Sequence, residues 1–483
     1  MDVKTKEVRS TAVAPGTLRG NGVKYLLDAC IVLVMCSLLY YGASWQIFKP
    51  FTDAAKYQCY GVAFWKGVDA LRTFPDNQCR FILHRSNITV TNASIAKKME
   101  QYHLPQPLVS YVASRSSAYR FHALPYEYPL LTIIPFSMGL LAPSRWYQVA
   151  FALWMALFAL LIYVALARYR SRRAAMAFAL YLVVGCWATA FGRFDLVQSA
   201  LTLFAVMFAV RKRWTWGFVM LALATLLKFY PVVLVVSFFI AQQMESSLSW
   251  KSWRRWQPLA AFVAVCAVVM VVSFILSPEG TLGPLGYFGN RPVQVESFSA
   301  SLMWLTSLIV HKPLTYAFTF GSLNTFGPLG SKVGIFGTLL LGAGLLFTYW
   351  LQWKRKIDLA TASLLTLLIL MVTGKVFSPQ YLIWVAPLVA YVGEADYRWL
   401  ISWSVIGGLT TWIYPYIYNM TKALLKVPYL PLFFPVTTVR NFLLLGFVVI
   451  LLIYCARRKP NVVASSEDVA SSQDVAVAPH TSI

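Results

Sequence analysis

The chain has 483 residues, of which 58% are hydrophobic and only 12% are charged, and its mean hydropathy is +0.61. Soluble domains carry roughly 25% charged residues, so this composition excludes an ordinary soluble protein. The formal net charge of +24 comes from short basic groups between long apolar blocks, a pattern that argues against nucleic-acid binding and is typical of cytoplasmic loops in membrane proteins.

The N-terminal part predicts an anchor followed by a long loop. Residues 1–23 are basic and are expected in the cytoplasm, and a first membrane-spanning helix runs from about Tyr25 to Trp45. The polar stretch 46–127 is then the first extracytoplasmic loop, expected to carry interfacial helices. Loops of this length tend to be functional. Cys59 and Cys79 share this loop, so a disulfide between them is plausible if the loop lies outside the cytoplasm.

Two apolar stretches in the middle of the chain are interrupted by proline. Tyr128–Leu141 contains several Pro and Gly residues and is interpreted as re-entrant or interfacial, with Tyr147–Ala167 as the true crossing. Gly217–Ala241 is interpreted as two short helices that break near Lys228–Pro231, because proline and the residue before it resist helix continuation. Lys228 is therefore expected at the outer rim of the membrane.

The remaining apolar blocks complete an all-α polytopic membrane protein. Later crossings are expected near Leu259–Leu276, Val333–Leu351, Leu359–Thr373, Tyr381–Val392, Leu400–Tyr416 and Asn441–Tyr454. The total is about twelve crossings, with both termini inside. Residues 24–456 thus form one transmembrane domain, and the polar, repetitive tail 457–483 is expected to be disordered in the cytoplasm.

This topology places the unusual polar residues on the outer side. They are Asp53, Arg193, Asp195, Lys228, Arg291, Glu296, Lys375 and Gln380. Ionisable groups at membrane depth are costly and usually mark a site. The cations Lys228, Arg291, Lys375 and Arg193 are candidates for holding a lipid-linked phosphate. A carboxylate there is a candidate general base for a hydroxyl group.

Six motifs occur along the chain in a definite order. They are Phe51-Thr-Asp53-Ala-Ala-Lys-Tyr57, Tyr126-Glu-Tyr-Pro129, Gly192-Arg-Phe-Asp195-Leu-Val-Gln198, Leu227-Lys228-Phe-Tyr-Pro231, Arg291-Pro-Val-Gln-Val-Glu296-Ser297 and Phe377-Ser-Pro-Gln380-Tyr-Leu-Ile-Trp384. Taken together, the chain resembles the polyprenyl-phosphate-mannose-dependent mannosyltransferases of the type C glycosyltransferase fold. This family includes the mycobacterial phosphatidylinositol mannoside α-1,2-mannosyltransferase.

The resemblance implies an enzyme of the plasma membrane with its active site on the extracytoplasmic face. The donor would be a polyprenyl phosphate sugar, with mannose as the favoured sugar, and the acceptor would be a glycolipid or glycan. The protein would also contact membrane lipids, and no nucleic-acid partner is implied. The catalytic base would be Asp53, acting with inversion, and neither a cofactor nor a metal is implied. Tyr57, Asp195, Glu296, Gln380 and His311 would support the site, although His311 matches no motif. Tyr128 is followed by one proline, where family members often have two.

Other interpretations stay open at this stage. Asp53 is also a favoured helix N-cap, Lys228 can reach the membrane surface from a helix end, and Arg291 with Glu296 can form a structural ion pair. For the whole chain, the alternatives are a transporter or flippase and a non-catalytic scaffold subunit. Coupled transporters typically carry inverted repeats and mid-membrane ionisable groups. The membrane region has no internal repeat, and its apolar blocks have almost no acidic residues apart from Asp28 near a cytoplasmic end.

Overall fold

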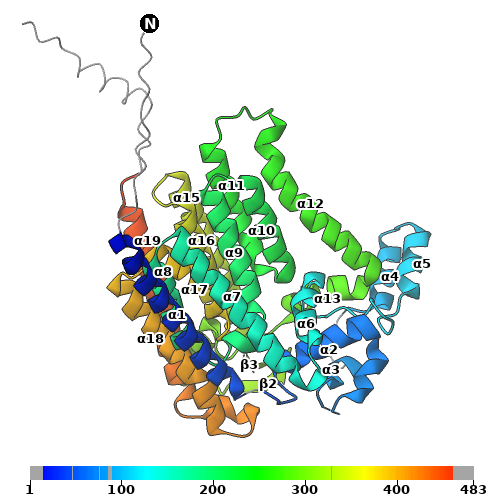
Figure 1. The fold of residues 1–483 in the computed structure, drawn as a ribbon. Coiled ribbons are helices and arrows are strands. Elements are labelled where there is room, and N and C mark those ends of the chain that lie inside the picture. Colours follow the sequence, from blue (N-terminus) through cyan, green and yellow to red (C-terminus); the bar gives the residue numbers. More distant parts are fainter. Residues whose placement is uncertain (1–14, 46, 76, 85–89, 328, 461–483) are drawn as a thin grey trace, which may run out of the picture.

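The computed structural model describes residues 15–45, 47–75, 77–84, 90–327 and 329–460. The predicted N-terminal segment lies mostly outside these residues, and so does nearly all of the predicted C-terminal tail. Within them the protein is a bundle of long helices with shorter helices and a small sheet at one end (Figure 1).

Twelve helices of the described chain make up the bundle. They are α1 (Pro15–Ser44), α7 (Tyr147–Tyr169), α8 (Arg172–Cys186), α9 (Asp195–Val210), α10 (Trp214–Leu227), α11 (Leu234–Glu245), α12 (Trp253–Leu276), α15 (Gly330–Trp353), α16 (Leu359–Thr373), α17 (Tyr381–Gly393), α18 (Tyr397–Thr411) and α19 (Phe433–Arg457). Five helices among the described residues are long and apolar enough to cross a membrane, and seven other apolar helices are shorter. The all-helical membrane character is thereby confirmed, whereas twelve crossings and the type C fold remain predictions.

The first loop folds into short helices that pack beside the bundle. They are α2 (Asp53–Lys66), α3 (Arg80–Leu83), α4 (Asn92–Gln101) and α5 (Gln106–Ser114). Thr52 begins α2 as its N-cap, because its side chain accepts a hydrogen bond from the backbone N–H of Ala55. The predicted disulfide between Cys59 and Cys79 is present and ties α2 to the segment before α3.

Both proline-interrupted stretches are broken as predicted. Tyr128–Leu141 contains only the short helix α6 (Ile133–Met138) between two single 3-10 turns. Helix α10 ends at Leu227, a 3-10 turn spans Tyr230–Val233, and α11 begins at Leu234. The break leaves Lys228 in extended backbone between two helices, so its side chain is free to turn into the bundle.

A three-stranded antiparallel sheet was not predicted. It has the order β1-β3-β2, with β1 (Val293–Gln294), β2 (Thr315–Thr319) and β3 (Ser322–Phe326). Phe320 and Gly321 form the two-residue turn of the hairpin, and both have positive φ angles, as a type I′ turn requires. In the sequence, helix α13 (Pro278–Asn290) precedes β1, and helix α14 (Phe298–Val310) lies between β1 and β2.

The basic turns between helices gather at the end of the bundle opposite this sheet, drawn uppermost in Figure 1. The Arg211 guanidinium lies 4.0 Å from the centre of the Tyr169 ring, which joins the turn after α9 to the end of α7. Arg170 pairs with Glu394 at 2.9 Å, and Lys356 donates to the carbonyl of Ala456 at 2.5 Å. These contacts join the turns after α7, α9 and α17 to one another and the turn after α15 to the end of α19, as expected for basic loops that lie on one side of a membrane.

Candidate functional site

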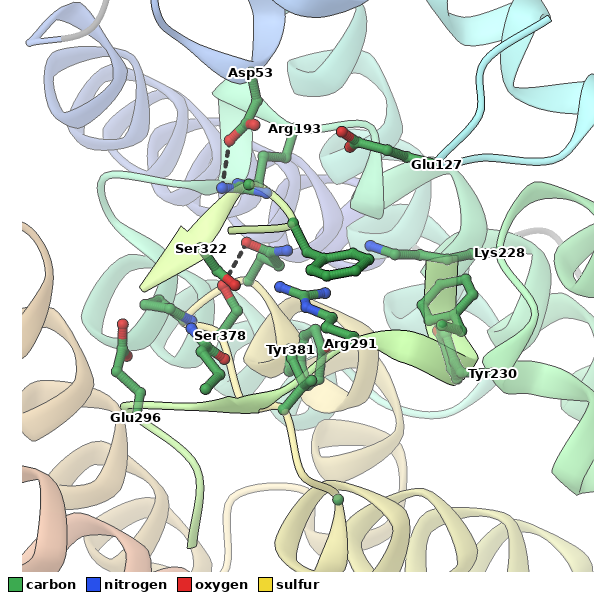
Figure 2. Close-up of a pocket in the computed structure, with 18 of the residues that line it drawn as sticks. Asp53, Glu127, Arg193, Lys228, Tyr230, Arg291, Glu296, Ser322, Ser378 and Tyr381 are labelled. Carbon is green, nitrogen blue, oxygen red and sulfur yellow. Dashed lines mark hydrogen bonds and ion pairs between the residues drawn. The ribbon is translucent and has the colours of Figure 1, made fainter. Parts of the chain in front are cut away.

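A cavity of about 560 Å³ opens at the end of the bundle that carries the sheet (Figure 2). Its walls come from the start of α2, the breaks before α9 and α11, the segment from α13 to β1, the hairpin, and the turn between α16 and α17. Seven of the ten predicted site residues line it: Asp53, Arg193, Lys228, Arg291, Glu296, Lys375 and Gln380. Residues that lie far apart in the sequence therefore share one chamber.

Asp53 is the first residue of α2 and its carboxylate forms an ion pair with Arg193 (Figure 2). The N-cap interpretation of Asp53 is wrong, because Thr52 takes that role. The side chains of Arg193 and Asp53 remain 21% and 24% exposed, respectively. This pair is therefore reachable from the cavity, and Arg193 fixes the direction of the carboxylate.

A second ion pair lies deeper and supports Lys228. The Lys228 Nζ lies 2.6 Å from Asp195 Oδ1, and the Asp195 side chain is fully buried. Gln198 and the Trp384 indole also donate to Asp195 Oδ1. Burial lowers the pKa of Lys228 below its ordinary value, and the Asp195 carboxylate opposes that effect. The buried Asp195 thus holds the Lys228 ammonium at the cavity wall. The side chain does not extend from a helix end to the membrane surface.

Aromatic rings hold this ammonium in place. The Trp384 ring stacks between those of Tyr230 and Tyr381, with centroids 4.1 and 3.7 Å away. Lys228 Nζ lies 4.7 Å from the Trp384 ring centroid, within the range of a cation–π interaction. Tyr57 is buried below the cavity, where its ring stacks on Phe136, and it does not line the wall.

Further cations line the cavity near Lys228. Lys375 donates to the carbonyl of Gly289 at 3.0 Å, and burial together with Arg291 lowers the pKa of Lys375. The Arg291 Nε is buried and has no hydrogen-bond partner among the described residues. An unpartnered guanidinium nitrogen beside a lysine is suited to an anionic ligand.

Glu296 is buried at the far side of the cavity, and Tyr418 donates to its Oε1 at 2.8 Å. Burial raises the pKa of Glu296 above its ordinary value. The suggested ion pair between Arg291 and Glu296 is not formed between these described residues. Instead, Arg440 and Asn441 of α19 donate to the Glu296 backbone carbonyl at 2.8 and 3.1 Å, so this loop is anchored from the core.

One predicted residue lies away from the cavity, and one acidic residue of its lining was not predicted. His311 is exposed at the end of α14, where its Nδ1 contacts the Ile309 carbonyl, and it lines no cavity described here. Glu127 was not predicted, yet it lines the cavity and points toward Arg193 in Figure 2. Its position inside the Tyr126–Pro129 motif was the signal that could have identified it.

Comparison with known proteins identifies the family. Residues 126–379 match the model of glycosyltransferase family 87, which is more than half of the chain. Arg193, Lys228, Arg291 and Lys375 lie inside the matched region, and Asp53 precedes it. A search of curated proteins finds no match. The chain belongs to glycosyltransferase family 87 and is a membrane glycosyltransferase.

Proposed function

We propose that this protein transfers a sugar, mannose in the first instance, from a polyprenyl phosphate donor to a hydroxyl group of a glycolipid or glycan. The observation that carries the proposal is the convergence of Lys228, Arg291 and Lys375 with the Asp53–Arg193 pair in one cavity. Cations in that number suit a phosphate leaving group, and a reachable carboxylate suits a hydroxyl nucleophile.

In the proposed reaction Asp53 accepts the proton of the acceptor hydroxyl. The acceptor oxygen attacks C1 of the sugar from the face opposite the phosphate, a new C1–O bond forms, and the configuration at C1 inverts. The bond from C1 to the phosphate oxygen breaks, and its electron pair leaves with polyprenyl phosphate. Lys228, Arg291 and Lys375 stabilise the charge that develops on this phosphate.

The cavity also has an apolar side that suits an isoprenoid chain. Val232, Val233 and Leu370 line it next to the broken helix. Val232 is 45% exposed, so this side continues onto the surface of the bundle. A lipid-linked donor needs such continuity, because its phosphate must enter a charged site while its tail stays in an apolar medium.

The test is transfer of radiolabelled mannose from polyprenyl phosphate mannose to a total lipid extract by the purified protein. We expect the Asp53→Asn variant to transfer about 10²–10⁴-fold more slowly, the usual contribution of a general base. Arg193→Gln breaks the same ion pair but keeps the carboxylate, so its loss should be smaller. Equal losses in both variants would reduce Asp53 to a structural partner of Arg193, and failure with any polyprenyl phosphate sugar would contradict the donor.

We further propose that the cavity opens on the extracytoplasmic side of the plasma membrane. The basic turns lie at the opposite end of the bundle, and basic loops remain in the cytoplasm. The disulfide between Cys59 and Cys79 lies at the cavity end, and disulfides persist in oxidising compartments.

A further inference from the structure

A second cavity of about 520 Å³ lies against the first one. The two share the side chains or backbone of Phe51, Lys56, Glu127, Phe318, Phe320 and Gly321. The second cavity therefore extends from the same chamber toward α2 and α3. A group transfer needs two substrates in contact, and two chambers with a common wall meet that requirement.

The hairpin turn between β2 and β3 forms the partition. Tyr287 donates a hydrogen bond to the carbonyl of Phe320, which fixes the turn against α13. A Cβ atom added to Gly321 would lie 3.6 Å from the Tyr287 hydroxyl and 3.9 Å from Lys56 Nζ. Side chains from α2 and α13 thus both approach the turn.

The position of Asp53 suits this division. Asp53 lines the first cavity only, whereas Lys56, three residues later on the same helix, lines both. Residues three apart on a helix share a face, so the Asp53 carboxylate lies next to the boundary between the chambers. A hydroxyl that enters from the second cavity would reach the carboxylate at that boundary.

The linings of the two cavities differ in chemistry. Arg193, Lys228, Arg291 and Lys375 line the first cavity and not the second. The second cavity has Asn77, Arg80, His84 and the rings of Phe81 and Tyr126, with Lys56 and Glu127 at the shared wall. Neutral amides, a guanidinium and aromatic rings form hydrogen bonds with hydroxyl groups and cover the apolar faces of a sugar ring.

We propose that the second cavity is the acceptor site and takes a hydroxyl-rich carbohydrate headgroup, with the β2–β3 turn separating it from the donor cavity. This inference rests on the proposed glycosyl transfer, because it assigns the second substrate of that reaction. Arg80 is then a residue that binds the acceptor, and Arg291 is a residue that binds the donor.

The test is photolabelling of the purified protein with octyl α-mannoside that carries a diazirine next to the sugar. We expect saturable labelling of peptides that line the second cavity, suppressed by unlabelled octyl α-mannoside and not by polyprenyl phosphate. The two arginines give a matched pair of variants. Arg80→Gln should reduce labelling about tenfold, the loss expected for one charged hydrogen bond, while Arg291→Gln should leave it unchanged. Polyprenyl phosphate binding should show the reverse dependence.

Several results would overturn the acceptor site. They are absence of saturable labelling, suppression by polyprenyl phosphate, equal labelling by a diazirine octanol without sugar, and a loss in Arg291→Gln but not in Arg80→Gln. Because labelling needs no turnover, it is read independently of the transfer assay. Failure of transfer with correct labelling would reject the proposed donor reaction, and transfer without labelling of this cavity would reject only the acceptor site.

Discussion

Two carboxylates, each at the first residue of a helix, serve different purposes. Asp53 is partly exposed and paired with Arg193, whereas Asp195 is fully buried beneath Lys228. Only the first can meet a substrate directly. The second acts through Lys228, by holding the ammonium at the cavity wall, and is a positioning residue.

Removal of one member of the buried pair should therefore destabilise the protein. Lys228→Met leaves the Asp195 carboxylate buried without its cation, which typically costs about 3–5 kcal/mol in the free energy of unfolding. Thermal unfolding in detergent would measure this loss. The double variant Asp195→Asn with Lys228→Met removes both charges, so it should recover most of the stability.

The same double variant separates stability from binding. If Lys228 holds the donor phosphate, the double variant should bind polyprenyl phosphate more weakly than the wild type, even though its stability is restored. Normal phosphate binding by a stable double variant would show that the pair is purely structural.

Among the elements, helix α2 is held in place by the segment before α3 as well as by the bundle. The disulfide joins Cys59 of α2 to Cys79, and the neighbouring Gln78 donates to Gln58 Oε1 of α2 at 3.0 Å. These links fix the wall of the second cavity that carries Asn77 and Arg80. Replacement of both cysteines by serine should cost about 3 kcal/mol of stability, as expected for a closed loop of this length.

Reductant provides the control for this prediction. Unfolding temperatures of the wild type with and without dithiothreitol should differ, while those of the double serine variant should coincide. A wild type that is insensitive to reductant under partly unfolding conditions would contradict a stabilising disulfide.

The close contact between α1 and the end of α8 gives a second prediction at the scale of the elements. A Cβ atom on Gly42 of α1 would lie 2.2 Å from the backbone oxygen of Trp187, so Gly42→Ala should push α1 away from the end of α8. Overpacking of this kind costs about 1–3 kcal/mol. Gly342→Ala in α15 is the matched control, since nothing lies within 4 Å of its added Cβ. Its stability should be unchanged or higher by up to about 1 kcal/mol.

At the scale of the whole molecule, the two ends of the bundle differ in chemistry. Basic turns occupy one end and both cavities the other. Single cysteines introduced at Phe51 and at Arg211 should therefore react from opposite sides of the membrane. In intact cells a membrane-impermeant maleimide should label the cysteine at 51, and the cysteine at 211 should react only after permeabilisation. The reverse pattern would place the cavities in the cytoplasm.

Much of this arrangement could be predicted from local sequence signals. Proline and apolar length indicated the broken helix at Lys228 and the positions of α16 and α17. The partners within the site could not be predicted, because Asp53 and Arg193 meet only through the packing of α2 on the bundle. The hairpin was missed although Gly321 follows an alternating strand, since this region was assigned only as the connection between the predicted crossings Leu259–Leu276 and Val333–Leu351.

The central helices are too short to span an ordinary bilayer. Helices α16 and α17 have 15 and 13 residues, which corresponds to about 22 and 20 Å against a hydrocarbon thickness of about 30 Å. Both are almost wholly buried, whereas α12 and α15 at the periphery are of full length and only 11% buried over their apolar spans. We therefore expect the floor of the cavity to lie below the level of the lipid headgroups. A membrane-anchored substrate could reach the charged groups by lateral diffusion, with no extraction of its tail from the bilayer.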